Sequence, residues 1–415
     1  MKVLHVVQGY FPGIGGTELA IQRISEGLVQ QFDDQVTVFT TNCFSGEAFN
    51  HPELPRMPTG REEINGVTVQ RFAVMSQISR LLRLPQANLG GFSLPGNQYW
   101  RTYYQGPLIR GLTKSIQETD FDLLVASSFP LQHMYQSLKA ARLSRRPCIL
   151  IGGLHPQDEW GFQRPMIYQA IQQADGYIAY TPFEAEYVIQ RGASPKKVYT
   201  SGLGVDLHHF QTQPDSQLRT RLGIPAEAPL VGYIGQLGWH KGVDTLLQAM
   251  PKVWQVFPQA YLLIAGARAS FAAVIDHFLE ELTPAQRRQV VLHYNFSDEE
   301  KPSLFSAVDV FVYPSGYESF GISFIEAWAV KKPVIGCRRG AVPWVVTAGR
   351  DGLLVEFKDD LMLAEAILAL LRNPGWAKQL GEHGYQKAIQ HYNWPAAIQR
   401  FRKIYEQVLE NYHKH

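Results

Sequence analysis

Residues 230–250 read LVGYIGQLGWHKGVDTLLQAM, an apolar run followed by a glycine-bearing loop and then an amphipathic stretch. This order is typical of a strand, a tight turn and a helix in a βαβ unit. Residues 3–24, VLHVVQGYFPGIGGTELAIQRI, have the same order without the same sequence. We therefore expect an α/β protein with two Rossmann-like, doubly wound parallel sheets.

Further β-branched runs alternate with amphipathic stretches along the whole chain, and each run is a predicted strand. The predicted strands of the first half are 3–8, 35–41, 67–74, 122–127, 148–151, 176–180 and 197–201, and those of the second half are 230–234, 261–265, 290–293, 310–313, 333–336 and 353–355. The polar, proline-bearing residues 207–229 predict the connection between an N-terminal domain, 1–207, and a C-terminal domain, 208–392. A helix predicted within 393–415 has apolar spacing that suits packing on either domain.

Composition limits the function. The chain has 415 residues, with 39 basic and 37 acidic side chains, so its net charge of +2 does not favour nucleic acid as a partner. Cys43, Cys148 and Cys337 are far apart and odd in number, which predicts buried thiols in a reducing compartment. The first apolar run is too short for a signal peptide, and no run reaches transmembrane length. We expect a soluble, cytoplasmic protein that at most sits on a membrane surface.

Four loops that follow predicted strands are candidate ligand sites. Gly15 and Gly16 precede a helix, where main-chain amides can approach an anion, or where a plain turn needs glycine. Lys241 stands where the second domain's first helix is expected to begin, a place that favours an anionic ligand. Residues 152–156, GGLHP, place His155 after a strand, where a histidine is often only hydrogen-bonded to the main chain.

Two glutamates mark the loop and helix after residues 310–313. Glu318 and Glu326 would lie ~12 Å apart along the axis if the whole interval were helical. That exceeds the roughly 5 to 9.5 Å of a glycosidase acid/base pair. Two separate ligand contacts are expected, and Glu326, inside an apolar run, needs a partner or a ligand.

Five stretches together resemble the retaining GT-B glycosyltransferases of family 4. They are GGTE at 15–18, SGLGVD at 201–206, GQLGWHKG at 235–242, VDVFVYPS at 308–315 with E-x7-E at 318–326, and PVIGCRRGAVPWVV at 333–346. They occur in the family's order and span nearly the whole chain. The resemblance implies a GT-B fold with an interdomain cleft and a C-terminal helix that packs back on the N-terminal domain.

The resemblance also implies a reaction, the transfer of a hexose from a nucleotide-diphosphate sugar, such as UDP-glucose, held mostly by the second domain. Catalysis would involve Lys241, Glu318 and His155, with Lys241 neutralising the leaving diphosphate. The implied donor-binding residues are Gly15, Gly16, Gln236, Lys241, Tyr294, Glu318, Ser319, Phe320, Gly321, Ile322 and Glu326. Such a site needs no metal and no cofactor other than the donor itself. Asp120-Phe121-Asp122 imitates a metal-binding Asp-x-Asp but precedes a strand, so we do not assign it.

Two departures from the family pattern bear on activity. Gln236 replaces a usual arginine or lysine, and Trp344 replaces a usual glutamate. Alternatives are therefore a weak or inactive nucleotide-sugar-binding partner subunit and a GT-B nucleotide-sugar epimerase, which E-x7-E disfavours.

Residues 56–146 carry 12 basic and 5 acidic side chains, several aromatic residues such as Phe92, Tyr99 and Trp100, and a helix-like RLLRL at 80–84. This region is predicted either to dock an anionic lipid-linked acceptor or a membrane surface, as in polysaccharide biosynthesis, or to be a solvated face over core aromatics. The acceptor itself, a sugar, a lipid-linked glycan or a small molecule, is not specified.

Overall fold

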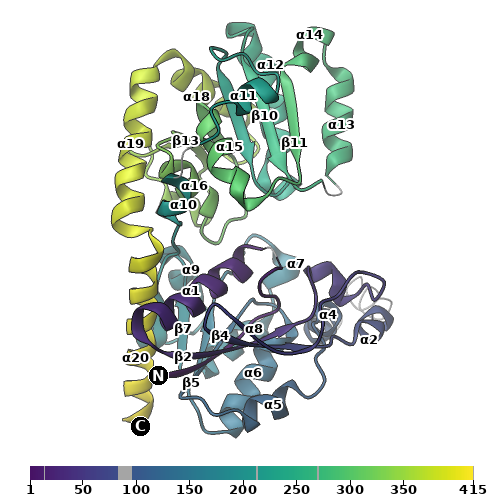
Figure 1. The fold of residues 1–415 in the computed structure, drawn as a ribbon, viewed down its shortest axis with the longest axis vertical. Helices are drawn as coiled ribbons and strands as arrows, with labels where there is room; N and C mark the ends of the chain where they lie inside the picture. Colours follow the sequence, from purple (N-terminus) through teal and green to yellow (C-terminus); the bar gives the residue numbers. More distant parts are fainter. Residues whose placement is uncertain (14, 83–95, 212–213, 269–270, 415) are drawn as a thin grey trace. The chain divides into compact units, whose positions relative to one another are not determined.

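The computed structural model describes residues 1–13, 15–82, 96–211, 214–268 and 271–414, and it divides into two compact units (Figure 1). Unit 1 comprises Met1–Gly202 and Trp394–His415, and unit 2 comprises Leu203–Asn393. The first division lies five residues before the predicted one at 207/208. Val205 explains the shift, because it forms a bridge with Asn393 and donates its N–H to the Tyr392 carbonyl at 2.7 Å. The two segments that connect the units, at Val205 and at residues 392–393, are therefore held together within unit 2.

Unit 1 is built on a sheet with the strand order β3-β4-β2-β1-β5-β6-β7-β8, described over the ranges given above. Its strands are β1 (Lys2–Val6), β2 (Gln35–Thr41), β3 (Gly60–Ile64), β4 (Val67–Phe72), β5 (Leu123–Ser127), β6 (Cys148–Ile151), β7 (Gly176–Ala179) and β8 (Val198–Thr200). All seven strands predicted for this half are present. Their apolar runs are buried because helices cover both faces of a parallel sheet.

The sequence reading missed β3, which pairs antiparallel with β4. Its solvent-facing, charged residues hide the strand pattern. The signal that could have found it is Asn65-Gly66, whose φ angles of +51° and +81° suit a two-residue hairpin turn.

The described helices of unit 1 are mostly short, and α1 and α20 are the longest. They are α1 (Gly16–Phe32), α2 (Ser76–Leu81), α4 (Asn97–Gln105), α5 (Leu112–Glu118), α6 (Gln132–Leu143), α7 (Glu159–Phe162), α8 (Pro165–Gln173), α9 (Pro182–Ile189) and α20 (Trp394–His413), with 3₁₀ turns η1 (Gly46–Phe49) and η2 (Pro195–Lys197).

The C-terminal helix α20 packs on the N-terminal domain, as the family resemblance implies, and contacts α1 (Figure 1). Arg402 Nε pairs with Asp34 Oδ2 at 2.7 Å, and Tyr405 Oη lies 3.2 Å from Nε2 of the buried His5. Gly27 of α1 faces Ile398 so closely that a side chain at position 27 would collide with it. The helix is therefore part of the core of unit 1.

Unit 2 contains a parallel sheet with the order β11-β10-β9-β12-β13-β14, in the described part of the chain. Its strands are β9 (Leu230–Ile234), β10 (Tyr261–Gly266), β11 (Val290–Tyr294), β12 (Val310–Tyr313), β13 (Val334–Cys337) and β14 (Leu353–Val355). Each corresponds to a predicted strand. The chain leaves β9 toward β11 and then returns to β12 on the other side of β9, so a topological switch point lies between β9 and β12.

Two groups of helices accompany this sheet, one with α12 and α18 and the other with α15, α16 and α19. The helices of unit 2 are α10 (Leu207–Gln211), α11 (Leu218–Arg221), α12 (Val243–Val256), α13 (Ala272–Glu281), α14 (Pro284–Arg288), α15 (Lys301–Ala307), α16 (Ile322–Ala329), α17 (Val342–Val345), α18 (Asp360–Arg372) and α19 (Pro374–His391), with 3₁₀ turns η3 (Trp239–Lys241) and η4 (Asp298–Glu300).

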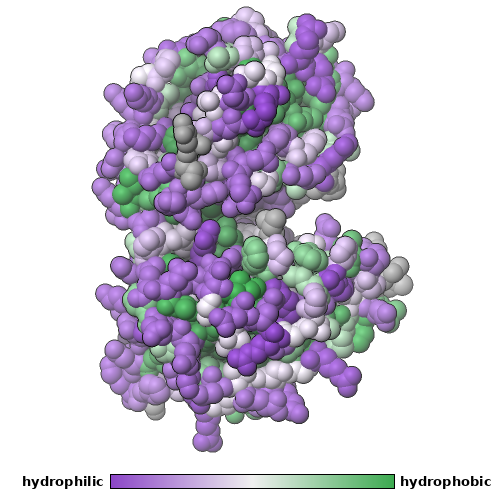
Figure 2. All heavy atoms as spheres, in the orientation of Figure 1, coloured by the Kyte–Doolittle hydropathy of each residue, from purple (hydrophilic) through white to green (hydrophobic). Residues whose placement is uncertain are grey.

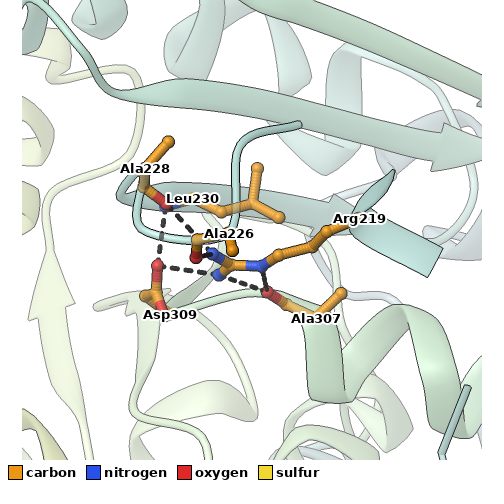
Figure 3. Close-up of polar contacts among 6 residues, drawn as sticks. All are labelled: Arg219, Ala226, Ala228, Leu230, Ala307 and Asp309. Atoms are coloured by element: carbon orange, nitrogen blue, oxygen red, sulfur yellow. Dashed lines mark hydrogen bonds and ion pairs between the residues drawn. The ribbon is translucent and has the colours of Figure 1, made fainter. Parts of the chain in front are cut away.

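Arg219 fixes the amino ends of β9 and β12 (Figure 3). Its guanidinium donates to the carbonyl of Ala307 at 2.6 and 2.8 Å and pairs with Asp309 Oδ2 at 3.0 Å. The same carboxylate accepts the N–H of Leu230 at 2.8 Å. Arg219 also holds the carbonyls of Ala226 and Ala228, so one side chain ties the entry into unit 2 to the two central strands.

The three cysteines are free and buried, as predicted. Among the described helices, none combines the length and the apolar character that crossing a bilayer would require. Hydrophilic residues cover most of the face in view in Figure 2, with small apolar patches between them.

We predict that buried histidines make unit 1 acid-sensitive. Burial lowers the pKa of His133 to about 4 and of His5 to about 3. Both are neutral in the folded protein, whereas the unfolded chain takes up protons below a pH of about 6.5. The free energy of unfolding should therefore be undiminished above that pH and fall as the pH drops toward 4, by up to about 1.4 kcal/mol per pH unit for each histidine.

Denaturant titrations between pH 6.5 and 4.5 test this with His133→Gln, which can still donate to the Ser127 carbonyl that His133 contacts at 2.7 Å. The slope should be shallower than in the wild type. Equal slopes for the two proteins would contradict the prediction.

Candidate active site

The loops after β9 and β12 lie against each other at the carboxyl edge of unit 2. Gly242 has φ +73°, and a β-carbon there would collide with the carbonyl oxygen of Pro314. The N–H of Gly316 donates to the His240 carbonyl at 3.0 Å. Only glycine at 242 allows this approach, because it tolerates both the positive φ and the close main chain.

Lys241 and Glu318 form an ion pair between these two loops. Lys241 Nζ lies 2.7 Å from Glu318 Oε1, and the side chains are only 11% and 10% exposed. Nζ also donates to the Tyr317 carbonyl at 3.3 Å. Lys241 ends η3, two residues before α12, so it is not the first helical residue that we expected. A pair this sheltered is costly to break, since the remaining charge would be buried alone.

The amino end of α16, which begins four residues after Glu318, adds main-chain donors. Gly321 precedes the helix with φ +94°, and Ile322 is its first residue. The first amides of a helix have no carbonyl partner within it and carry the positive end of its dipole. Ser319 is half-buried, and the Phe320 ring packs on Tyr392 with centroids 5.4 Å apart. Phe320 can therefore offer a ligand little besides its main chain.

Glu326 has a protein partner that the sequence reading missed. Its Oε1 lies 3.2 Å from Nζ of Lys301, which also pairs with Asp298 at 2.7 Å. Burial disfavours the charged ammonium, yet Glu326 and Asp298 outweigh this and raise the pKa of Lys301 above its usual value. Only the second half of the interval 318–326 is helical.

Two further predicted donor contacts lie at the end of β11 and just after β9, two strands that β10 separates. Tyr294 ends β11, with Arg268 5.8 Å from its ring centre, and burial raises the pKa of its phenol. Gln236 is exposed, and its main-chain carbonyl accepts from Tyr233 Oη at 2.6 Å. The side chain is neutral, so position 236 adds no charge to the site.

In unit 1, Gly15 and Gly16 begin α1. Gly15 has extended backbone with φ −174°, and Gly16 has open space where a side chain would be. The carboxylate of Glu18 lies beside Gly15 and accepts from Gln8 Nε2 at 2.8 Å. The carboxylate of Glu18 therefore lies at the amino end of α1, where we expected an anionic ligand, and it would compete with such a ligand. The sequence motif did not reveal this competition.

His155 follows a loop that is held by a buried glutamate. Glu184 Oε1 accepts the N–H groups of Gly153 and Leu154 at 2.8 and 3.0 Å and the hydroxyl of Tyr177 at 2.7 Å. Burial raises the pKa of Glu184. The sequence reading missed Glu184 because nothing near residue 184 shows that β6 and α9 meet. The His155 ring itself packs edge-on against Phe162, at 5.5 Å between centroids.

Residues 120–122, which imitate a metal-binding Asp-x-Asp, contact Lys2 near the start of the chain. Asp120 accepts from Lys2 Nζ at 2.6 Å, and Asp122 accepts from the Lys2 N–H at 2.7 Å. Across the described ranges, no group of three His, Cys, Asp or Glu residues could hold a metal.

The basic region 56–146 is not uniformly exposed. Arg71 is buried and pairs with Glu62, and Arg56 donates to the Ala48 carbonyl and to Ser76 Oγ, each at 2.6 Å. These two cations therefore stabilise the fold. Tyr99 and Trp100 are exposed, whereas Phe92 and residues 83–84 of RLLRL lie outside the described residues.

Two family models match the chain in sequence. Glycosyltransferase Family 4 matches residues 14–209, and Glycosyl transferases group 1 matches residues 215–387. One relative is a D-inositol 3-phosphate glycosyltransferase of Corynebacterium diphtheriae, 28% identical over 74% of this chain and 69% of its own length. Another is an alpha-maltose-1-phosphate synthase of Mycolicibacterium smegmatis, 27% identical over 58% of this chain and 65% of its own length. The chain thus spans about two thirds of each.

Solved structures share the fold of the whole chain. HepE of Anabaena, in complex with UDP and glucose, has a TM-score of 0.73 at 19% identity and covers 98% of this chain and 100% of its own. Sucrose-phosphate synthase of Thermosynechococcus elongatus has a TM-score of 0.71 at 20% identity, covering 99% of this chain and 100% of its own.

Gly242→Ala should dislodge the loop that carries Lys241. Gly223 provides a matched control in the same unit, since it has φ +70° but open space around its missing side chain. Gly223→Ala should cost about 1 kcal/mol of unfolding free energy for the positive φ alone. Gly242→Ala should cost a further ~1–3 kcal/mol for the collision with Pro314. Chemical denaturation measures both, and equal costs would disprove the tight contact between the loops.

Proposed function

The chain belongs to the GT-B glycosyltransferases, as a family 4 domain followed by a group 1 domain, and we propose that it transfers a hexose from a UDP-sugar without a metal. We assign UDP-glucose as the donor of choice and retention of the anomeric configuration as the outcome. Retention rests on the family resemblance, and the uridine donor is supported by the structural neighbour that binds UDP.

The observation that carries the proposal is the Lys241–Glu318 pair at the switch point of unit 2. Glycosyl transfer builds negative charge on the leaving diphosphate and positive charge on the anomeric carbon. Lys241, with the amides at the start of α16, would stabilise the diphosphate. Glu318 would contact the sugar and holds the lysine in place.

The remaining assigned residues would orient the donor. Glu326, fixed by Lys301, would bind the ribose hydroxyls, and Tyr294 at the end of β11 would lie by the base. From unit 1, Gly16 would face the diphosphate, and His155 would approach the transferred sugar from a loop that Glu184 holds.

The acceptor would be a sugar, a polyol or a lipid-linked glycan. The names of two relatives and one neighbour contain a phosphate ester, which makes a phosphorylated small molecule a reasonable first substrate to test. The exposed aromatic residues of α4 offer a surface for a lipid-linked acceptor instead.

A thermal-shift panel of UDP-, GDP- and ADP-sugars without added metal tests the donor. A ligand at 100 times its Kd should raise the stability by about 2.7 kcal/mol. We expect selective stabilisation by a UDP-sugar, unchanged by a chelator. A shift without turnover of any donor would favour the inactive-partner alternative, to which the neutral Gln236 and the exposed Trp344 would then contribute. No shift with any donor would contradict the proposed donor.

Lys241→Ala should lower kcat about a hundredfold, with a smaller effect on donor affinity, because its charge matters most as the diphosphate departs. Lys387→Met is a matched control, since Lys387 pairs with the buried Asp351 at 2.9 Å at the opposite, amino end of β14. Both variants break a sheltered ion pair, but only Lys241→Ala should reduce kcat in steady-state assays of UDP release. An unchanged kcat would refute the role of Lys241.

A further inference from the structure

Three aromatic side chains gather at the carboxyl edge of unit 2, each from a loop that follows a different strand. Trp239 comes after β9, Tyr317 after β12 and Phe357 after β14. Tyr317 lies edge-on to both others, with ring centroids 5.3 Å from Trp239 and 6.2 Å from Phe357. Trp239 is 53% exposed, so this aromatic cluster reaches the surface of the unit.

Two cations lie on these rings. The guanidinium carbon of Arg339, in the loop after β13, is 5.3 Å from the Tyr317 centroid and 4.7 Å from that of Phe357. Lys358 Nζ is 5.7 Å from the centroids of both Trp239 and Phe357. Stacking uses the face of a guanidinium and leaves the N–H groups at its edge available to an acceptor.

The neighbouring carboxylate does not neutralise this pair of cations. Glu356 pairs with Arg338 instead, at 3.2 Å between Oε1 and Nε. In the residues that the structure describes, neither Arg339 nor Lys358 has a carboxylate within ion-pair distance. Two cations that share aromatic faces and lack an acid suit an oxyanion with several acceptor oxygens, such as a phosphate.

The strand order places the strands before Arg339 and Lys358 beyond the strand before Lys241, although Lys358 Nζ reaches back to Trp239 in the loop after β9. Along the carboxyl edge, Tyr294 ends β11, Lys241 follows β9, Glu318 follows β12 and Arg339 follows β13. Adjacent strands are about 4.8 Å apart, so Arg339 lies roughly two strands beyond Lys241, on the far side of the residue assigned to the sugar. Lys241 is also paired with Glu318 and donates to the main-chain carbonyl of Tyr317. The ring of this tyrosine is the one on which Arg339 lies.

From this arrangement we propose that Arg339 and Lys358 bind a phosphate group carried by the acceptor. The inference rests on the proposed function, because the donor must occupy the Lys241 side of the edge. It assigns part of acceptor recognition to unit 2, and it selects acceptors with a phosphate monoester or a diphosphate. The site binds and orients, and it takes no part in bond breaking.

The test uses the full chain saturated with UDP, so that the anion site at Lys241 is already filled. Inorganic phosphate is titrated at constant ionic strength, and binding is followed by the thermal shift. We expect saturable binding that Arg339→Gln and Lys358→Gln each weaken about tenfold. Arg339→Lys should retain part of it, and Arg338→Gln, the adjacent cation paired with Glu356, should bind as the wild type.

Two results would overturn the assignment. If UDP abolishes phosphate binding, the cations serve the donor diphosphate, and if Arg339→Gln binds like the wild type, they bind no phosphate. The melting temperatures of the ligand-free variants show whether a loss reflects folding. A wild type that does not respond to UDP would instead refute the proposed function, and phosphate binding that depends on Arg339 would still support the site.

A second arm identifies the source of the phosphate. Glucose 6-phosphate and inositol 1-phosphate represent soluble acceptors, and farnesyl diphosphate represents a lipid carrier. We expect one of these two classes to bind more tightly than inorganic phosphate, and we expect Arg339→Gln to lose this binding. The class that behaves in this way is the source of the phosphate. Binding of unphosphorylated glucose and inositol that shows the same dependence on Arg339 would contradict phosphate recognition.

Discussion

The placement of β9 directly beside β12 is the constraint on which the site depends. Asp309 accepts from Arg219 and from the N–H of Leu230, which holds the amino ends of the two strands together. Parallel strands that start together also end together, so the loops with Lys241 and Glu318 must meet at the other edge. Two residues 77 positions apart thereby form one sheltered ion pair. Gly242 then permits the close approach of the loops.

The strands and their order along the chain could be predicted because buried parallel strands are short, continuous apolar runs between glycine and proline signals. The edge strand β3 could not, since its side chains face water and its pattern is charged. The candidate loops could also be predicted, because sites in such folds follow strands. Their interactions could not, because partners such as Lys301 for Glu326 and Glu184 for the His155 loop depend on which helices the fold brings together.

Several charged side chains of this molecule already have partners within the protein. Lys241, Lys301 and Arg219 each have a carboxylate, and Glu18 lies by the amino end of α1. A site that holds its own ion pairs is organised before any ligand arrives, and a ligand must exchange or extend existing contacts. Sequence motifs show these charges but not their partners, so the motifs alone do not determine these contacts.

The return of α20 to unit 1 has a consequence for how the protein is made. Residues 1–202 leave the ribosome long before Arg402 and Tyr405, the partners of Asp34 and His5. Unit 2 is synthesised in between and can fold as a continuous stretch. The nascent first domain must therefore wait with the α1 surface uncovered, and its final stability is reached only after α20 has been synthesised.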